Sequence, residues 1–323
     1  MNAIFLWPKP EALTLRHFLG QAIRIGDIES RLRDLFPGAE PVLFSSGRAG
    51  LNATLEHLSC NRPDLVWCPP FSSHCVFDAI SRIATPITQP SPQIRAALIY
   101  HHWGYVHSHN FPPTVEIIED AVDTLFVPGT NPFAVDGRFV LWSLPKTIAS
   151  QFGGVVFCRD HHDADALRCL RDRRTIPAAT MQALLRLLSL RFPSAARYWH
   201  GAEASSGPLP DFALRQIAER LEQLPSLAES RRARIGLIAP HSLYPAPDMD
   251  RLPSNIPVAP SPNIQALFDT DGYFSAGLRS INVERRAPGG VWIKAAPVAI
   301  HAGTGDSILV HIANQLRTEP QTS

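Results

Sequence analysis

Short apolar runs alternate with helical stretches between residues 41 and 160, and this alternation restricts the chain to few architectures. Each run is only a few residues long, which suits strands that are buried on both faces of a parallel or mixed sheet. We expect helices between them, in GRAGLNATLEHL and SSHCVFDAISRI. The pattern therefore predicts an α/β fold. The expected strands are PVLFSS, LVWCPP, AALIYHH, VEIIED, RFVLWSL and GGVVFCRD.

The second half of the chain has a different pattern. Residues 161–236 carry apolar residues at three- and four-residue spacing and are expected to be almost wholly helical, with an interruption at Pro225. A proline-rich passage follows, and the chain closes with short strands and a helix in GDSILVHIANQL. A length of 323 residues suits two domains. We expect a large α/β domain over 1–236 and a smaller C-terminal domain over 237–323.

Composition excludes several classes of function. The net charge is +1 and the basic residues are scattered, so no nucleic-acid partner is expected. No apolar window approaches the roughly 20 residues of a membrane helix, and the N-terminus does not read as a signal peptide. The five cysteines include no CxxC pair, which favours reduced thiols and a cytoplasmic protein over a zinc site.

Lysine is rare in this chain: of 30 basic residues only three are Lys, at positions 9, 146 and 294. Lys146 stands between two strand-like runs, shortly before a Gly-Gly pair. Apolar surroundings disfavour an ammonium ion, and a neutral amine can attack a carbonyl to form a Schiff base. The alternative is a surface lysine at a strand end that extends its charged head into water.

Two other elements suit a ligand site at the carboxyl edge of such a sheet. Ser45, Ser46 and Gly47 turn a strand into a helix, and the free N–H groups of such a turn suit a phosphate. Glu119 and Asp120 end an apolar strand, where a carboxylate can pair with a protonated ring nitrogen. Each has an ordinary alternative: a small-residue helix cap for the turn, and a cap or solvated acid for the carboxylates.

The order of turn, aspartate and lysine resembles that of the fold type I pyridoxal phosphate enzymes, and more closely the DegT-type (DegT/StrS) sugar aminotransferases. The resemblance runs from about residue 40 to 317 and implies a mainly parallel central sheet flanked by helices, with a smaller C-terminal α+β domain. The stretches that carry it are SSGRAGLNATLEHL, VWCPPFSSHCVFDAI, IYHHWGY, VEIIEDAVDTL, the lysine strand leading into Gly-Gly, LPDFALRQIAERLEQLPSLAESRRARI and PVAIHAGTGDSILVHIANQL.

The resemblance implies pyridoxal 5'-phosphate as cofactor and a role for each matching residue. Lys146 would form the Schiff base and shuttle the substrate's α-proton, and Asp120 would pair with the pyridinium nitrogen. The family's sites lie at a dimer interface, so a homodimer with shared active sites is implied. The other implied contacts are Gly47, Arg48, Ala49 and Ser143 for the phosphate, His74 or Ser73 stacked on the ring, and Asp123 at the ring hydroxyl. Ser206 falls near the sequence position where the family has an asparagine that reaches the phosphate of the neighbouring subunit.

The sequence departs from the family's pattern at several positions. The familiar serine five residues before the lysine is Leu141 here, and Ser143 would replace it. A carboxylate at Asp123 would repel the cofactor's phenolate oxygen unless it were protonated or turned away. Only about a dozen residues separate HHWGY from VEIIED, so a crossover helix is expected to be reduced to a loop.

Two clusters of cationic or metal-binding residue types invite functional interpretations. His101, His102, His107 and His109 follow one another closely, but their spacing fits no standard motif, and no metal is expected. Arginines in GLRSINVERR are candidates for recognising a substrate carboxylate or phosphate, with a solvated face as the alternative. They are Arg279, Arg285 and Arg286.

Three functions remain open on the sequence. The first is an aminotransferase that moves an amino group from a small-molecule donor, glutamate or glutamine by resemblance, to a keto acceptor such as a nucleotide-linked sugar. The second is a non-catalytic or regulatory descendant that binds ligand without turnover. The third is a pyridoxal phosphate-dependent dehydratase or lyase, which Lys146 disfavours because the family's sugar dehydratases have His at that position.

Overall fold

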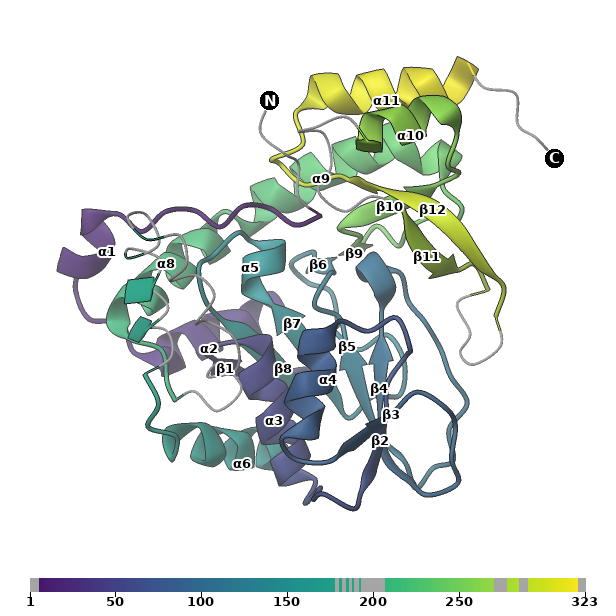
Figure 1. Cartoon of the computed structure of the whole chain (residues 1–323). Coiled ribbons are helices and arrows are strands. Elements are labelled where there is room, and N and C mark those ends of the chain that lie inside the picture. Colours follow the sequence, from purple (N-terminus) through teal and green to yellow (C-terminus); the bar gives the residue numbers. More distant parts are fainter. Residues whose placement is uncertain are drawn as a thin grey trace.

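The computed structural model describes residues 6–177, 207–269, 278–284 and 290–318, with a few separate positions between 180 and 192. Its centre is a seven-stranded sheet with the spatial order β1-β8-β7-β5-β4-β2-β3 (Figure 1). All six expected strands are present, and β3 is added at one edge. The strands are β1 Glu40–Phe44, β2 Leu65–Trp67, β3 Thr85–Ile87, β4 Ile94–Tyr100, β5 Glu116–Asp120, β7 Phe139–Ser143 and β8 Gly154–Cys158.

Most of this sheet is parallel. Only β8 runs against its neighbours, β1 and β7, while β7, β5, β4, β2 and β3 pair in parallel. The connection from β4 to β5 contains only a single 3-10 turn, His102–Gly104, and then loop. The predicted loss of a crossover helix at this place is therefore confirmed. The carboxyl ends of the parallel strands gather at one edge, where ligands bind in open α/β sheets.

Helices cover both faces of the sheet because successive strand residues point to opposite sides. Phe139 and Leu141 of β7 share a core cluster with α3, α4 and α6, whereas Val140 and Trp142 share another with α2, α8 and α9. Pro225 lies in the first turn of α9, just after α8 has ended, so the predicted interruption is confirmed. The helices are α2 Ile25–Leu35, α3 Gly47–His57, α4 His74–Ser81, α6 His161–Asp172, α8 Asp211–Glu222 and α9 Leu224–Ile238.

A smaller antiparallel sheet, with the order β10-β12-β11, lies above the large one in Figure 1, and α10 and α11 accompany it. A further pair, β6 with β9, ties the two regions together. The expected smaller α+β portion is thus present. Helix α9 extends past residue 236, so the domain boundary stays a prediction. The bounds are β6 Leu125–Phe126, β9 Arg251–Leu252, β10 Asn255–Val258, α10 Pro262–Asp269, β11 Arg279–Asn282, β12 Trp292–Ala299 and α11 Asp306–Thr318.

Several short elements were not foreseen from the sequence. Strand β3 has three residues, with Pro86 in the middle, and occupies the sheet edge where proline is tolerated. Helix α5, Leu144–Thr147, is a single turn with Pro145 in its first positions. Such short segments carry too little periodicity to be recognised. Every helix among the described residues is too short or too polar to cross a membrane.

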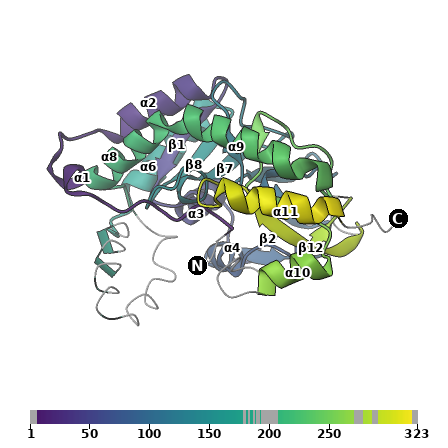
Figure 2. The ribbon, with the colours of Figure 1, turned by 90° about the horizontal axis from the view of Figure 1, so that it is seen from above.

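The N-terminal segment before α1 (Leu15–Leu19) runs back over the carboxyl edge of the large sheet (Figure 2). The Glu11 amide donates to the Ala149 carbonyl at 2.9 Å, close to α5. Nearer the N-terminus, the Leu6 carbonyl accepts a hydrogen bond from Asn255 Nδ2 of β10 at 3.2 Å. The segment is therefore held at both ends, and Trp7 lies between the large and small sheets.

Candidate active site

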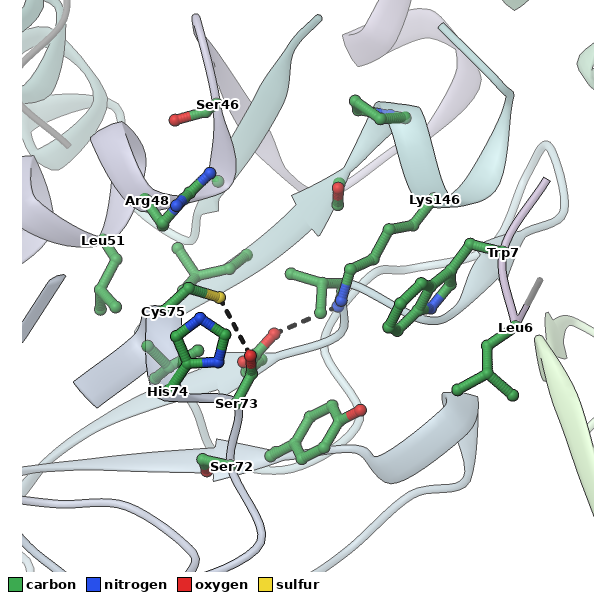
Figure 3. Close-up of a pocket in the computed structure, with 18 of the residues that line it drawn as sticks. Leu6, Trp7, Ser46, Arg48, Leu51, Ser72, Ser73, His74, Cys75 and Lys146 are labelled. Carbon is green, nitrogen blue, oxygen red and sulfur yellow. Dashed lines mark hydrogen bonds between the residues drawn. The ribbon is translucent and has the colours of Figure 1, made fainter. Parts of the chain in front are cut away.

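A cavity of about 760 Å³ opens at the carboxyl edge of the large sheet. It lies between the start of α3, the start of α4, the ends of β4, β5 and β7, the single turn of α5, and the N-terminal segment. Strand β11 of the small sheet contributes Arg279 and Ser280. Figure 3 shows Lys146 and Trp7 on one side of this cavity, with Ser46, Arg48 and His74 facing them.

The turn into α3 is packed closely by backbone. Ser46 is the N-cap of α3, and its Oγ accepts the Ala49 amide at 3.1 Å. A Cβ at Gly154 would come within 2.2 Å of the Gly47 nitrogen. Gly153 has φ +104° and donates its amide to the Ser45 carbonyl at 2.9 Å. The Gly-Gly pair after the lysine is thus explained, because only glycine lets β8 begin against this turn.

The two adjacent carboxylates of β5 point in opposite directions, as alternation along a strand requires. Glu119 is fully buried away from the cavity, where it accepts His101 Nε2 at 2.9 Å and the amides of Ala134 and Gly137 at 2.9 and 3.2 Å. Asp120 lines the cavity. Burial raises the pKa of Asp120 to about 7, and nearby Lys146 opposes this shift.

Lys146 extends into the cavity from α5, and its side chain is 30% exposed. Its Nζ donates to Asp123 Oδ1 at 3.1 Å and lies 4.3 Å from the centre of the Trp7 ring. The wholly apolar surroundings expected for this amine are therefore not found. The structure supplies the amine with an anionic partner and an aromatic face, both of which stabilise a cation.

Asp123 is fully buried and accepts hydrogen bonds from three side chains. Trp7 Nε1 donates to Oδ1 at 2.7 Å, Lys146 donates to the same oxygen, and the Tyr100 hydroxyl donates to Oδ2. Burial alone would raise the pKa of Asp123, but the Lys146 charge and these three hydrogen bonds hold it below its ordinary value. The same burial, together with the Asp123 charge, raises the pKa of Tyr100 well above its ordinary value. Asp123 is therefore an anion, and Tyr100 a neutral donor.

The wall opposite α3 is aromatic. His102 lies 5.2 Å from both Phe71 and Tyr100, measured between ring centres, and 4.0 Å from Trp103. Burial lowers the pKa of His102 to about 4, so its imidazole is neutral at physiological pH. Trp103 has φ +57°, in the left-handed region that non-glycine residues rarely adopt. Strained backbone of this kind is characteristic of ligand sites.

The structure brings together most of the residues predicted to contact a cofactor. Ala49 does not line the cavity: it is buried, and its amide donates to Ser46 Oγ. His74 and Ser73 line the cavity as exposed residues at the start of α4. Ser206, Arg285 and Arg286 lie outside the described residues. The predicted residues that line the cavity are Gly47, Arg48, His74, Asp120, Ser143, Lys146 and Arg279, while Asp123 lies behind Lys146.

Sequence reasoning missed Trp7 and Tyr100, and it gave His102 and Phe71 no role in this cavity. Tyr100 ends β4 at the same edge as Asp120, with which it pairs in register, so its position at a strand end was an available signal. Trp7 carried no such signal, because it precedes every predicted element. Its place beside Lys146 depends on how the N-terminal segment crosses the sheet.

The cavity suits an aldehyde cofactor with a phosphate and a basic ring nitrogen. Lys146 supplies the amine, and the buried Asp120 supplies a carboxylate for the nitrogen. The α3 N-terminus at Gly47 and the Arg48 side chain supply positive potential for a phosphate. The fold and these groups together define a pyridoxal phosphate enzyme of fold type I.

The chain belongs to a family of pyridoxal phosphate-dependent aminotransferases. A family model described as "Putative PLP-dependent aminotransferase" matches residues 28–275, which is most of the chain. No curated protein matches the sequence significantly. The protein is therefore an aminotransferase whose cofactor is pyridoxal phosphate.

Solved structures share its fold at low sequence identity. A protein described as "Putative sugar aminotransferase Spr1654 from Streptococcus pneumoniae, PMP-form" has a TM-score of 0.62 at 14% identity, covering 97% of this chain and 98% of its own. A DegT DnrJ EryC1 StrS aminotransferase from Brucella abortus has a TM-score of 0.60 at 14% identity, covering 91% and 89%. DesI with its TDP-sugar product has a TM-score of 0.59 at 14% identity, covering 91% and 83%. The fold type I prediction, and the resemblance to DegT-type enzymes at the level of fold, are confirmed.

Proposed function

We propose that the protein transfers an amino group from glutamate or glutamine to the keto group of a nucleotide-linked sugar. The support for a sugar acceptor is the fold shared with Spr1654, described as a "Putative sugar aminotransferase", and with DesI, which was solved in the presence of its TDP-sugar product. The observation that carries the proposal is the convergence of Lys146, Asp120 and the α3 N-terminus on one cavity of about 760 Å³.

Each group has a separate task in this proposal. Pyridoxal phosphate, when bound, supplies an aldehyde that accepts the amino group and a ring that takes up negative charge. Lys146 would hold the aldehyde covalently through Nζ and would carry the substrate's α-proton. Asp120 would pair with the protonated ring nitrogen, and the buried position of Asp120 would make that charged pairing strong. Gly47, Arg48 and Ser143, which line the cavity, would hold the phosphate.

The substrate would occupy the side of the cavity nearest the small sheet. Arg279 of β11 faces this space and provides a cation for a donor carboxylate or an acceptor phosphate. The aromatic wall of Phe71, His102 and Trp103 provides flat apolar surface for a sugar ring. His102 is neutral at physiological pH and so does not compete with Arg279 for the anionic group.

The visible spectrum of the purified protein with pyridoxal phosphate tests the proposal. We expect a near-visible band that borohydride bleaches, absent from Lys146→Ala and present in Lys294→Ala, which removes an exposed lysine on β12. Glutamate should convert the band to the pyridoxamine spectrum with release of a keto acid. A wild-type protein that forms no band would support ligand binding without turnover. A band that amino donors leave unchanged, together with elimination of water from a sugar substrate, would support a dehydratase.

The proposal extends to assembly and compartment. Helix α1 exposes Leu15, Phe18 and Leu19, and exposed apolar side chains of this kind suit an interface between two copies of the chain. We propose a homodimer in which each chain completes the other's site, which light scattering and mixed dimers of inactive variants would test. All five cysteines are free thiols, which supports a reducing, cytoplasmic environment.

A further inference from the structure

Asp123, the buried carboxylate behind the lysine, is assigned to the ring hydroxyl by resemblance but has no task in the function proposed above. We propose that Asp123 is the counter-ion of Lys146, and that Trp7 and Tyr100 are positioning residues that hold its carboxylate against the amine. The inference rests on the proposed function, in which Lys146 is the residue that binds the cofactor. It concerns what happens to that amine whenever it is not bonded to the cofactor.

Three elements far apart in the sequence build this arrangement. Trp7 comes from the N-terminal segment, Tyr100 from the end of β4, and Lys146 from α5. Their donors together occupy both oxygens of Asp123, which has no solvent exposure. A carboxylate so buried is stable as an anion only if its oxygens accept hydrogen bonds and a cation lies nearby. Both conditions are met here, and the cation is Lys146.

Two carboxylates face this region, but only one bonds the lysine. Asp123 is 3.1 Å from Nζ, whereas Asp120 accepts the Val122 amide at 3.3 Å and influences Lys146 through space. The carboxylate that bonds the lysine is held as an anion, and the other keeps its proton up to near neutral pH. This difference leaves Asp120 available for the cofactor's ring nitrogen while Asp123 serves the amine.

The other charged and titratable groups do not replace Asp123. His102, behind Tyr100, is neutral because burial lowers its pKa to about 4. Arg231 of α9 is buried behind α5, donates to the Thr147 carbonyl at 3.5 Å and interacts with Asp123 through space. Arg279, on β11 of the small sheet, influences His102 through space. Asp123 is therefore the anion that acts directly on Lys146.

The arrangement also fixes where the free amine lies. The face of the Trp7 ring is 4.3 Å from Nζ, and Figure 3 shows the two side chains next to each other. The same indole donates to the oxygen that accepts from Lys146. One side chain therefore contacts both members of the ion pair. A lysine released from the cofactor would return to this position, beside Asp123 and the Trp7 ring, rather than moving freely in the cavity.

The scarcity of lysine makes the inference directly measurable. With three lysines in the chain, trace acetylation by acetic anhydride and mass spectrometry can follow Lys146 beside two exposed internal standards, Lys9 and Lys294. The reagent attacks only the unprotonated amine, so the rate follows the fraction of neutral lysine at each pH. The measurement uses the full chain without cofactor, and it is independent of whether the protein transaminates.

Asp123→Asn is the decisive variant. An opposite charge within about 4–6 Å favours the charged form strongly, so its removal should increase Lys146 acetylation at pH 8 by about tenfold relative to Lys9 and Lys294. The rates of the variant and the wild type should converge at high pH, where every lysine is neutral. Asp120→Asn should change the rate less. The proposal is overturned if Asp123→Asn leaves the ratio of Lys146 to Lys9 and Lys294 acetylation unchanged, or if Asp120→Asn changes this ratio as much or more. It is also overturned if the rates of variant and wild type still differ at high pH, because the variant would then have altered access of the reagent.

Milder variants keep the test decisive if Asp123→Asn fails to fold. Tyr100→Phe and Trp7→Phe each remove one donor to Asp123 and keep an aromatic ring at the position, and each should raise Lys146 acetylation at pH 8 by about twofold to threefold. Neither variant should change Lys9 or Lys294. If both leave Lys146 at its wild-type rate, the positioning role is excluded. The cofactor spectrum is recorded separately, so failure of this inference and failure of the proposed function are distinguishable.

Discussion

The two sides of the cavity are built in different ways. The turn side consists of Ser46, Gly47, Gly153 and Gly154, which belong to two short segments that meet through backbone atoms. The amine side consists of Trp7, Tyr100, Asp123 and Lys146, which come from four segments and meet through side chains. Backbone contacts on the turn side are set by local conformation, whereas the amine side exists only once distant segments have packed.

This difference predicts how each side responds to change. A Cβ added at Gly154 would lie 2.2 Å from the Gly47 backbone nitrogen, and rotating a side chain cannot relieve such a contact. The turn side should therefore be intolerant of added atoms. The amine side shares one carboxylate among three donors, so loss of one donor leaves two. We therefore expect large effects from single substitutions on the turn side and graded effects on the amine side.

Gly154→Ala should produce the largest loss of stability. The added methyl would meet the Gly47 nitrogen and the Ser46 carbonyl carbon, and β8 would have to move away from the turn. We expect the free energy of unfolding to fall by about 3 kcal/mol, together with weaker binding of pyridoxal phosphate. Urea denaturation and a cofactor titration measure the two effects.

The matched control is Gly26→Ala on α2, where an added Cβ would meet no atom within 4 Å. Because alanine favours a helix over glycine, this control should be neutral or stabilise by up to about 1 kcal/mol. If Gly154→Ala were as stable as this control, the close packing of the turn side would not be the reason for the Gly-Gly pair.

The contrast also explains what the sequence made predictable. The turn at Ser46, the strand ending in Asp120 and the lysine before Gly-Gly are local patterns, and the structure brings all three to one cavity. The Ala49 amide, which was assigned to the phosphate, donates to the capping Ser46 hydroxyl in this structure, so that assignment stays a prediction. A capping serine is itself a local pattern that is visible in the sequence.

The amine side was not predictable for a physical reason. Asp123 was assigned to the ring hydroxyl by resemblance, and its contact with Lys146 depends on Trp7 and Tyr100 being present at the same place. No periodicity or spacing relates residue 7 to residue 123. The error about apolar surroundings of Lys146 has the same origin, because neighbours in sequence are not the neighbours of its amine.

Asp120→Asn tests the difference between the two carboxylates through pH. The pKa of Asp120 is about 7 in the folded protein and about 3.9 in an unfolded chain, so the folded state keeps a proton that the unfolded state releases between these values. Stability from this group is therefore full below about pH 4 and is lost as the pH rises through 7. The Asn side chain cannot ionise. The free energy of unfolding of the variant should therefore rise relative to that of the wild type by on the order of 2 kcal/mol between pH 5 and pH 8.

Denaturant melts of both proteins without cofactor, at pH 5 and pH 8, provide the measurement. The titration of His102 affects both proteins alike and cancels in the difference. With pyridoxal phosphate bound, the wild type should be more stable than Asp120→Asn, since the wild-type carboxylate then has a cation to pair with. If the difference in free energy of unfolding between variant and wild type were the same at pH 5 and pH 8, Asp120 would not titrate near neutrality.

Trp7→Phe should have the smallest effect of the three. The substitution removes the indole N–H that donates to Asp123 at 2.7 Å but keeps an aromatic ring beside Lys146. Because Lys146 and Tyr100 still donate to the carboxylate, we expect a loss of about 1 kcal/mol, seen as a lower denaturant midpoint at unchanged slope. Trp292→Phe is the control: this exposed tryptophan contacts Phe71, and its loss should cost less than about 0.5 kcal/mol.

The double variant Trp7→Phe, Tyr100→Phe then asks whether the donors act together. If each donor compensates for loss of the other, the pair should cost more than the sum of the single changes, by at least about 0.5 kcal/mol. Simple additivity would show that the two hydrogen bonds are independent. In that case the graded response expected of the amine side would arise from separate contacts rather than from one shared carboxylate.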